Sequence, residues 1–269
     1  MSLPEFFASQ KWISPKVYCF IINLRNRLRG KKHTVYPFRN QLYLVDDNFK
    51  RLYICRRSRH GRSSFGVVNG LESLAGQYGL NDLKGLSGGT FVDCGANVGE
   101  LGLWAKSRGM KYIAFEPESL EADCCDLNNF NGESCTQRVA LWNSSATLEF
   151  YTKPDTADSS LISLGSGSAT KKIRAVRLDS ILGENDLRQR PAIFKLEAEG
   201  AEPEVLEGAG KLLLNFDYIA IDCGPERGEE KRHTFVETNI FLADLGFRPI
   251  SANFKRVTIL YKNTKSIAN

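Results

Sequence analysis

The chain has 269 residues and a net charge of +5; 42% of its residues are apolar and 25% are charged. These values are typical of a soluble globular protein and exclude collagen-like and disordered chains. No run of eighteen apolar residues occurs, so no transmembrane helix is expected. The length fits one α/β domain with an N-terminal addition, or two small domains.

The cysteines predict reduced thiols. There are seven, an odd number, and none belongs to a Cys-x-x-Cys motif. Disulfide frameworks and zinc sites have paired spacings. We therefore expect neither, and we expect a cytoplasmic protein.

Positive charge is concentrated at the front of the chain. Residues 1–62 carry 14 Lys or Arg against 3 Asp or Glu, whereas the remainder carries 22 against 28. This asymmetry indicates contact with a polyanion or an anionic surface, or a basic face that is simply solvated.

Residues 1–85 are predicted to form a basic N-terminal extension, beginning with one or two helices over residues 4–29. The apolar stretch 17–24 is too short to span a bilayer and is followed directly by basic residues. Such a helix could lie on an anionic membrane surface, so that the protein would be peripheral to a membrane. We favour packing on the catalytic domain or on a dimer partner.

Short antiparallel strands are predicted next, at 34–38, 41–45 and 51–55. The segment 56–62 is interpreted as a basic loop that either binds phosphate or is solvated. Aromatic residues are not interleaved with its charges, so no nucleic-acid partner is expected. A helix over 70–83 completes the extension.

Residues 86–269 are predicted to form a second domain, a cofactor-binding one, in which strands and helices alternate. The pattern predicts an α/β fold whose mostly parallel sheet has helices on both faces. The predicted strands are 90–94, 111–116, 134–140, 193–196 and 216–222, with helices at 98–108, 118–130, from 202, and 233–245, and a final hairpin of 247–251 and 255–261. Further strands at 147–151 and 173–177 flank a Ser/Gly/Thr-rich segment, 154–172, which we interpret as a lid over the site.

The first core strand ends in a glycine-rich turn with the pattern Asp93-x-Gly95-x-x-x-Gly99. Glu116 ends the next strand, where its carboxylate can accept hydrogen bonds from a ribose. The spacing differs from the Gly-x-Gly-x-x-Gly of dinucleotide binders, which disfavours an NAD-dependent dehydrogenase. An acid before the glycines suits the amino group of S-adenosylmethionine (SAM). The predicted cofactor residues are Asp93, Gly95, Ala96, Asn97, Gly99, Glu116, Pro117 and, at the adenine, Ala140 and Leu141.

Three segments together resemble the FkbM family of SAM-dependent methyltransferases. They are residues 92–99, residues 114–117, and the block Lys195-Leu196-Glu197-Ala198-Glu199-Gly200-Ala201-Glu202 with its continuation to Ala209. The resemblance implies a class I, Rossmann-like fold of seven strands with the last one antiparallel. It also implies O-methylation of a hydroxyl on a sugar or secondary metabolite. The family usually has Asp at the position of Glu197.

Methyl transfer to an alcohol needs in-line positioning and a group that removes the hydroxyl proton. The candidates, with Glu197 favoured, are Lys195, Glu197, Glu199, Asp222 and His233. Lys195 could instead pair with a neighbouring glutamate, and His233 could lie beside a helix cap. No metal ligands are assigned, although the carboxylates could hold Mg²⁺.

The predicted activity is O-methylation of a sugar or glycan acceptor. The alternatives are a lipid-linked or polyketide acceptor, and a non-catalytic polyanion- or membrane-binding module on the same scaffold. A homo-oligomer is left open.

Overall fold

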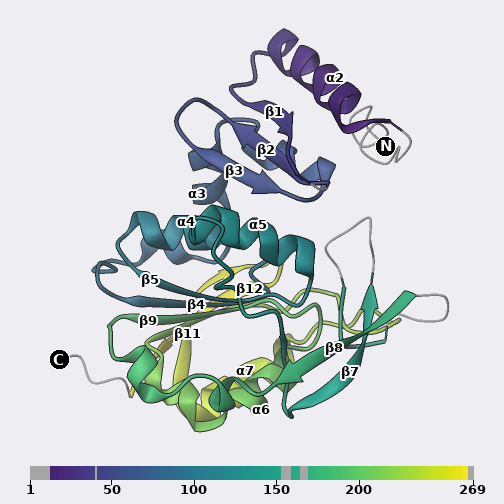
Figure 1. Ribbon diagram of the computed structural model, residues 1–269. Coiled ribbons are helices and arrows are strands. Elements are labelled where there is room, and N and C mark those ends of the chain that lie inside the picture. Colours follow the sequence, from purple (N-terminus) through teal and green to yellow (C-terminus); the bar gives the residue numbers. More distant parts are fainter. Residues whose placement is uncertain (1–12, 40, 153–158, 164–168, 266–269) are drawn as a thin grey trace.

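The computed structural model describes residues 13–39, 41–152, 159–163 and 169–265. Its larger part is an α/β arrangement of three layers, with helices on both faces of a mixed sheet (Figure 1). A smaller N-terminal unit, one helix on a three-stranded sheet, lies over one of the two helical layers.

In the described residues, the main sheet has six strands in the order β11-β12-β10-β9-β4-β5. They are β4 (Thr90–Cys94), β5 (Lys111–Phe115), β9 (Ala192–Leu196), β10 (Tyr218–Asp222), β11 (Phe247–Asn253) and β12 (Thr258–Asn263). Strands β5, β4, β9 and β10 are parallel, and β12 is antiparallel to β10, as the resemblance implies. Strands β4 and β9 are neighbours and place Asp93 opposite Lys195. Both strands are buried throughout, as expected for strands covered on both faces.

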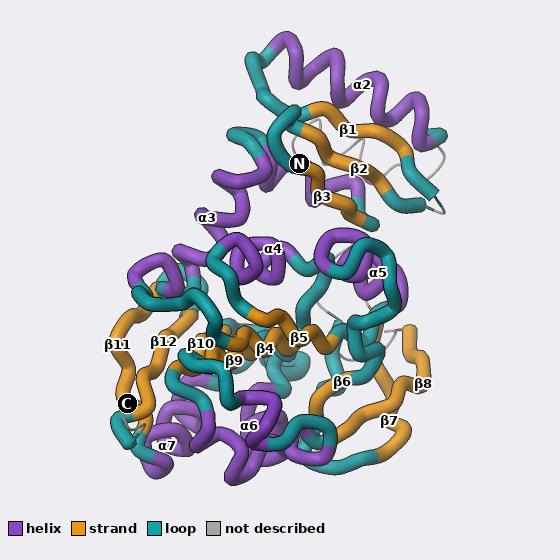
Figure 2. Tube along the Cα trace, turned by 60° about the vertical axis from the view of Figure 1, so that its left-hand side comes forward, coloured by secondary structure: helices purple, strands orange, loops and turns teal. Residues whose placement is uncertain are grey.

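Helices α4 (Glu100–Ser107) and α5 (Ser119–Asn129) cover one face of this sheet, and α6 (Glu202–Ala209) and α7 (Phe235–Leu245) cover the other (Figure 2). Pro203 lies in the first turn of α6, where its missing N–H is not needed. Helix α7 ends at Gly246 in a left-handed conformation. Short 3₁₀ helices connect the remaining elements: η3 (Leu178–Ser180), η4 (Glu184–Leu187) and η5 (Gly210–Asn215).

The strand predicted at 134–140 is not formed as a member of the main sheet. Gln137 makes only a single parallel bridge to Phe115. The carboxylate of Asp126 accepts the N–H groups of Cys135 and Thr136, which are therefore not available to a strand ladder. The main sheet has six strands where the sequence predicts seven.

A second, small sheet contains β6 (Ala140–Leu141), β8 (Ala169–Val176) and β7 (Ala146–Thr152), in that order. Strands β7 and β8 confirm the extended segments predicted on either side of the lid. Residues 154–158 and 164–168 of the predicted lid lie outside the described residues. Its last four residues, 169–172, are not a loop but belong to β8, where they pair with β7.

The N-terminal unit begins with α2 (Pro15–Leu28), which packs on β1 (Thr34–Pro37), β2 (Tyr43–Asp46) and β3 (Arg51–Ile54). Residues 4–12 of the predicted helix lie outside the described residues. The basic segment predicted as a loop is mostly helical, in η1 (Arg57–Ser63). It is followed by α3 (Val67–Gln77) and η2 (Leu80–Asp82).

Buried apolar side chains form two clusters. One extends from Tyr18 of α2 to Phe91 of β4 and Trp104 of α4, so the N-terminal unit and this helical layer share a core. The other, which includes Phe194 and Leu206, lies on the opposite face of the sheet. The division of the chain between residues 85 and 86 stays a prediction.

All seven cysteines lie in the described residues and are free thiols. Within that part of the chain, no helix has both the length and the apolar character needed to cross a bilayer.

Candidate functional site

A cavity lies at the carboxyl ends of β4, β5 and β9, the edge where open α/β sheets bind ligands. Eight of the nine predicted cofactor residues line it: Asp93, Gly95, Ala96, Asn97, Glu116, Pro117, Ala140 and Leu141. Three predicted catalytic residues line the same cavity: Lys195, Glu197 and Glu199. The fold therefore joins the glycine turn to the acidic block that lies far from it in the sequence.

The turn after β4 uses its own N–H groups within the protein. The N–H groups of Gly95 and Ala96 both donate to the carbonyl oxygen of Phe115 at 3.0 Å. The N–H of Asn97 donates to the carboxylate of Glu116 at 2.8 Å, and the next two N–H groups also stay within the turn. The N–H groups of residues 95–99 are therefore all engaged within the protein, and that of Asn97 helps to fix the position of Glu116.

The two glycines of the turn have different neighbours. Gly95 has φ +71°, and a Cβ there would lie 2.1 Å from the carbonyl oxygen of Glu197. Gly99 has φ +77°, and a Cβ there would lie 2.2 Å from the side-chain nitrogen of Asn129 on α5. Gly99 is not among the described residues that line the cavity. Its geometry is explained by close packing of α4 against α5.

Glu116 is the best-placed group for a ribose. Its side chain is buried, and its two oxygens accept the N–H groups of Asn97 and Glu118, both at 2.8 Å. A carboxylate oxygen has a second lone pair, so each can also accept a hydroxyl. Burial raises the pKa of Glu116 to about 7, although these two N–H groups favour the charged form.

This raised pKa predicts pH-dependent cofactor binding. Ribose hydroxyls donate to the charged carboxylate, so protonation of Glu116 competes with binding. Affinity for the product S-adenosylhomocysteine should be constant above pH 7 and fall by about tenfold per pH unit below it. Glu116→Gln should weaken binding by about 10–100-fold at high pH and abolish the pH dependence. Calorimetric titrations across this range would test it; a wild-type affinity that does not change with pH contradicts the prediction.

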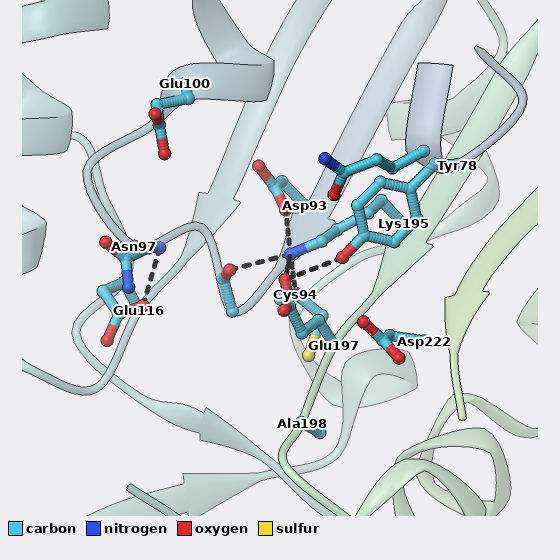
Figure 3. Close-up of polar contacts among 12 residues, drawn as sticks. Tyr78, Asp93, Cys94, Asn97, Glu100, Glu116, Lys195, Glu197, Ala198 and Asp222 are labelled. Carbon is cyan, nitrogen blue, oxygen red and sulfur yellow. Dashed lines mark hydrogen bonds and ion pairs between the residues drawn. The ribbon is translucent and has the colours of Figure 1, made fainter. Parts of the chain in front are cut away.

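The ammonium of Lys195 lies at the centre of a charged cluster (Figure 3). Its Nζ is 3.1 Å from Asp93 and 3.2 Å from Glu197, and it donates to the carbonyl oxygens of Cys94 and Gly95. Burial lowers the pKa of Lys195, but the two carboxylates outweigh burial and raise the pKa above its ordinary value. Lys195 therefore stays charged and ties the end of β4 to the end of β9.

Asp93 is engaged within the protein on both carboxylate oxygens. One accepts the hydroxyl of Tyr112 at 2.9 Å, and the other faces Lys195. The geometry explains Asp93 as the group that holds Lys195. Its contact with the amino group of a cofactor stays a prediction.

Glu197 is held by three donors. One oxygen accepts the hydroxyl of Tyr78 at 2.8 Å and lies near Lys195, and the other faces Arg256 at 3.1 Å. Burial raises the pKa of Glu197, but Lys195 and Arg256 outweigh burial and lower it to about 2. A carboxylate with so low a pKa is a weak base near neutral pH. This geometry suits positioning better than the predicted proton transfer.

The two remaining catalytic candidates are not among the described residues that line the cavity. Asp222 is buried and reaches the cluster through Arg256, which lies 2.7 Å from it. His233 is exposed. The fold thus adds Asp222 to the cluster but does not bring His233 to it.

We call Asp93, Lys195, Glu197, Asp222 and Arg256 the strand-tip cluster. Its three carboxylates face two cations, which leaves one negative charge. Excess negative charge beside the cavity favours a cationic ligand. Together with the buried Glu116 carboxylate, the site fits SAM.

Sequence reasoning missed several residues of the site. Tyr78 follows α3, and Arg256 lies between β11 and β12; neither belongs to a local motif. Three further arginines line the cavity, Arg56, Arg59 and Arg62, which we call the arginine row. The sequence singled out their segment, 56–62, as a phosphate-binding or solvated loop but did not place it at the cavity.

In the described part of the chain, no group of three or more His, Cys, Asp or Glu side chains could hold a metal ion. The Mg²⁺ requirement stays a prediction.

Comparison with known proteins gives two findings. The model of the methyltransferase FkbM domain matches residues 93–249. Among solved structures, a SAM dependent methyltransferase from Aquifex aeolicus is similar, with 14% identity, a TM-score of 0.40, and coverage of 72% of this chain and 89% of that chain. The search of curated proteins gave no match.

Proposed function

Because this chain belongs to the FkbM methyltransferase family, we propose that it transfers the methyl group of SAM to a hydroxyl of a sugar or glycan. The observation that carries the proposal is that the glycine turn, Glu116 and the block around Glu197 all line one cavity. A cofactor site and a set of charged groups for an acceptor thus lie side by side.

The residues of the cavity have separable roles in this proposal. Glu116 would accept hydrogen bonds from the ribose, and Ala140 and Leu141 would line the adenine pocket. SAM, when bound, supplies a methyl group on a positively charged sulfur. The strand-tip cluster, with its excess negative charge, would stabilise that charge in the ground state and position the methionine end.

The acceptor hydroxyl must be held in line with the methyl group and must lose its proton. The charged lining supplied by Glu197, Glu199 and Arg256 suits a polyol, which both donates and accepts hydrogen bonds. We assign proton acceptance to Glu199, which lines the cavity, since Lys195 and Arg256 make Glu197 a weak base. Positioning accounts for most of the acceleration in such a reaction.

Two measurements test the proposal. Calorimetry with SAM and S-adenosylhomocysteine should give micromolar binding. Transfer of a tritiated methyl group should then label an acceptor in a screen of cell-extract glycans and lipids. Binding of polyanions without binding of either cofactor form would instead identify a non-catalytic module, and labelling confined to lipids would replace the glycan acceptor.

Glutamine substitutions separate the two glutamates. Glu199→Gln should lower kcat by about 10²–10⁴-fold, the range for loss of a general base, with cofactor affinity nearly unchanged. Glu197→Gln should lower kcat less, because it removes a positioning group. Both are measured on the labelled acceptor, with exposed Glu230→Gln as the control. A larger loss of kcat in Glu197→Gln than in Glu199→Gln, with unchanged cofactor affinity, would show that Glu197 is the base.

A further inference from the structure

The arginine row forms one wall of the cavity. Arg56 precedes the 3₁₀ helix η1, and Arg59 and Arg62 follow at intervals of three residues. Side chains three apart are eclipsed in a 3₁₀ helix, which places Arg59 and Arg62 on one side of η1. All three arginines line the cavity. Arg59 also lies close enough to Glu197 for their charges to interact.

The row carries more positive charge than its partners neutralise. Arg62 lies 2.8 Å and Arg59 3.6 Å from Glu100, and Arg56 lies 2.6 Å from Glu121. Three cations therefore share two carboxylates, since the third acid near them, Glu197, is already paired with Lys195 and Arg256. The side chains of Arg56 and Arg59 are only 15% and 13% exposed.

In the described residues, one buried atom of the row has no hydrogen-bond partner, Nη1 of Arg56. A buried guanidinium nitrogen without an acceptor is unfavourable, and a ligand oxygen in the cavity would satisfy it.

We propose that the arginine row binds an anionic group, a phosphate or a carboxylate, carried by the acceptor. Guanidinium groups bind both groups in bidentate geometry. The cationic sulfonium of the cofactor is matched by the strand-tip cluster, whose excess charge is negative, and the row offers the opposite charge to the second substrate. This inference rests on the proposed function and specifies its acceptor as an acidic sugar or sugar phosphate.

The test uses the full chain saturated with S-adenosylhomocysteine and a pair of probes that differ in charge. Glucose 1-phosphate, and glucuronic acid for the carboxylate, should bind at least tenfold more tightly than methyl glucoside, and added salt should reduce the difference. Arg59→Gln should abolish this preference. If Arg59→Gln does not fold, Arg62→Gln, at the exposed end of the row, replaces it as the test variant. The matched control is Arg248→Gln, an exposed arginine on the edge strand β11.

Each outcome decides one point. Equal binding of the charged and neutral probes, or an unchanged preference in both row variants, overturns the anionic acceptor. A loss of S-adenosylhomocysteine affinity in the row variants, with no change for the probes, assigns the row to the cofactor carboxylate and also overturns it. Failure of wild type to bind S-adenosylhomocysteine at all would instead contradict the proposed function.

A second inference rests on α2, at the outer edge of the molecule (Figure 1). Tyr18, Cys19 and Ile22 are buried on its inner face. Its outer face carries an apolar stripe, defined by four side chains that are 51–80% exposed: Val17, Phe20, Leu24 and Leu28. Their spacing of three or four residues places them in one line along the helix.

The charges around the apolar stripe favour an anionic lipid surface as its partner. Lys16 and Arg27 are exposed on α2, Arg29 and Lys32 are exposed just after it, and the helix contains no acidic residue. Packing of a second copy on the same stripe would bring these cations together, which opposes a dimer. An apolar stripe bordered by basic residues is the pattern of a helix that lies in a membrane interface.

We infer that the apolar stripe of α2 docks the protein on an anionic membrane. The full chain should float with vesicles of phosphatidylcholine and phosphatidylserine, and much less with phosphatidylcholine alone. Phe20→Ser with Leu24→Ser should reduce the bound fraction at least tenfold. Val236→Ser with Ile240→Ser, on the exposed face of α7, is the matched control and should bind like wild type.

Absence of flotation, or flotation that the α2 variant does not change, overturns this inference. Sedimentation tests whether a second copy of the chain covers the stripe instead. A wild-type protein that is dimeric, does not bind vesicles and becomes monomeric with the α2 substitutions would assign the stripe to a dimer interface.

Discussion

Lys195→Met is expected to lower the free energy of unfolding by about 3–5 kcal/mol, the range for breaking a buried ion pair from one side. Lys195 and Asp93 are both buried, and their charges are 3.1 Å apart. Methionine replaces the apolar stem of the lysine but leaves the carboxylate without its cation. For a chain of this size the melting temperature should fall by on the order of 10 °C.

The partner of Lys195 supplies the decisive control. Adding Asp93→Asn to Lys195→Met removes the uncompensated charge, so the double variant should recover at least about 1 kcal/mol relative to Lys195→Met. Lys211→Met, at an exposed position, should leave the melting temperature unchanged. Additive losses in the double variant would show that the pair does not act as a unit.

Gly95→Ala is expected to abolish measurable cofactor binding and to destabilise the protein by about 2–5 kcal/mol. Positive φ contributes about 1–2 kcal/mol for a residue with a Cβ, and overpacking about 1–3 kcal/mol. The added Cβ would lie 2.1 Å from a backbone oxygen of Glu197, which cannot rotate away. The turn must therefore move away from the acidic block, and the cavity between them changes shape.

A variant of a second glycine, Gly85, distinguishes the cost of positive φ from the cost of steric overlap. Gly85 has φ +65°, similar to Gly95, but a Cβ there would meet no atom within 4 Å. Gly85→Ala should therefore show only the loss due to positive φ, about 1–2 kcal/mol, with normal affinity for S-adenosylhomocysteine. Calorimetry and thermal unfolding of the two variants give the comparison. Equal behaviour would mean that contact with Glu197 does not shape the site.

Local sequence patterns predicted most of the central sheet and of the turn at its edge. The apolar strands, the glycine turn and the acid at 116 are short segments whose residues act on their immediate neighbours, so their conformation can be read from a few positions. The pairing of β4 with β9 agrees with the small set of connection rules that parallel sheets obey. The prediction of a third strand at 134–140 is wrong, because the carboxylate of Asp126 on α5 accepts the N–H groups of Cys135 and Thr136 that a strand would have used.

The sequence by itself determined the α/β framework and eight cofactor residues that line the cavity. Only the tertiary structure decided which charges meet there. Tyr78, Arg256 and the arginine row come from segments far apart in the chain, and each reaches the cavity through packing rather than through a local motif. The same packing decided the protonation of Glu197: burial raises its pKa, but the charges of Lys195 and Arg256 outweigh burial and lower the pKa to about 2, which makes Glu197 a weak base. Coulomb interactions depend on distance in space and on burial, and neither is written in the order of the residues.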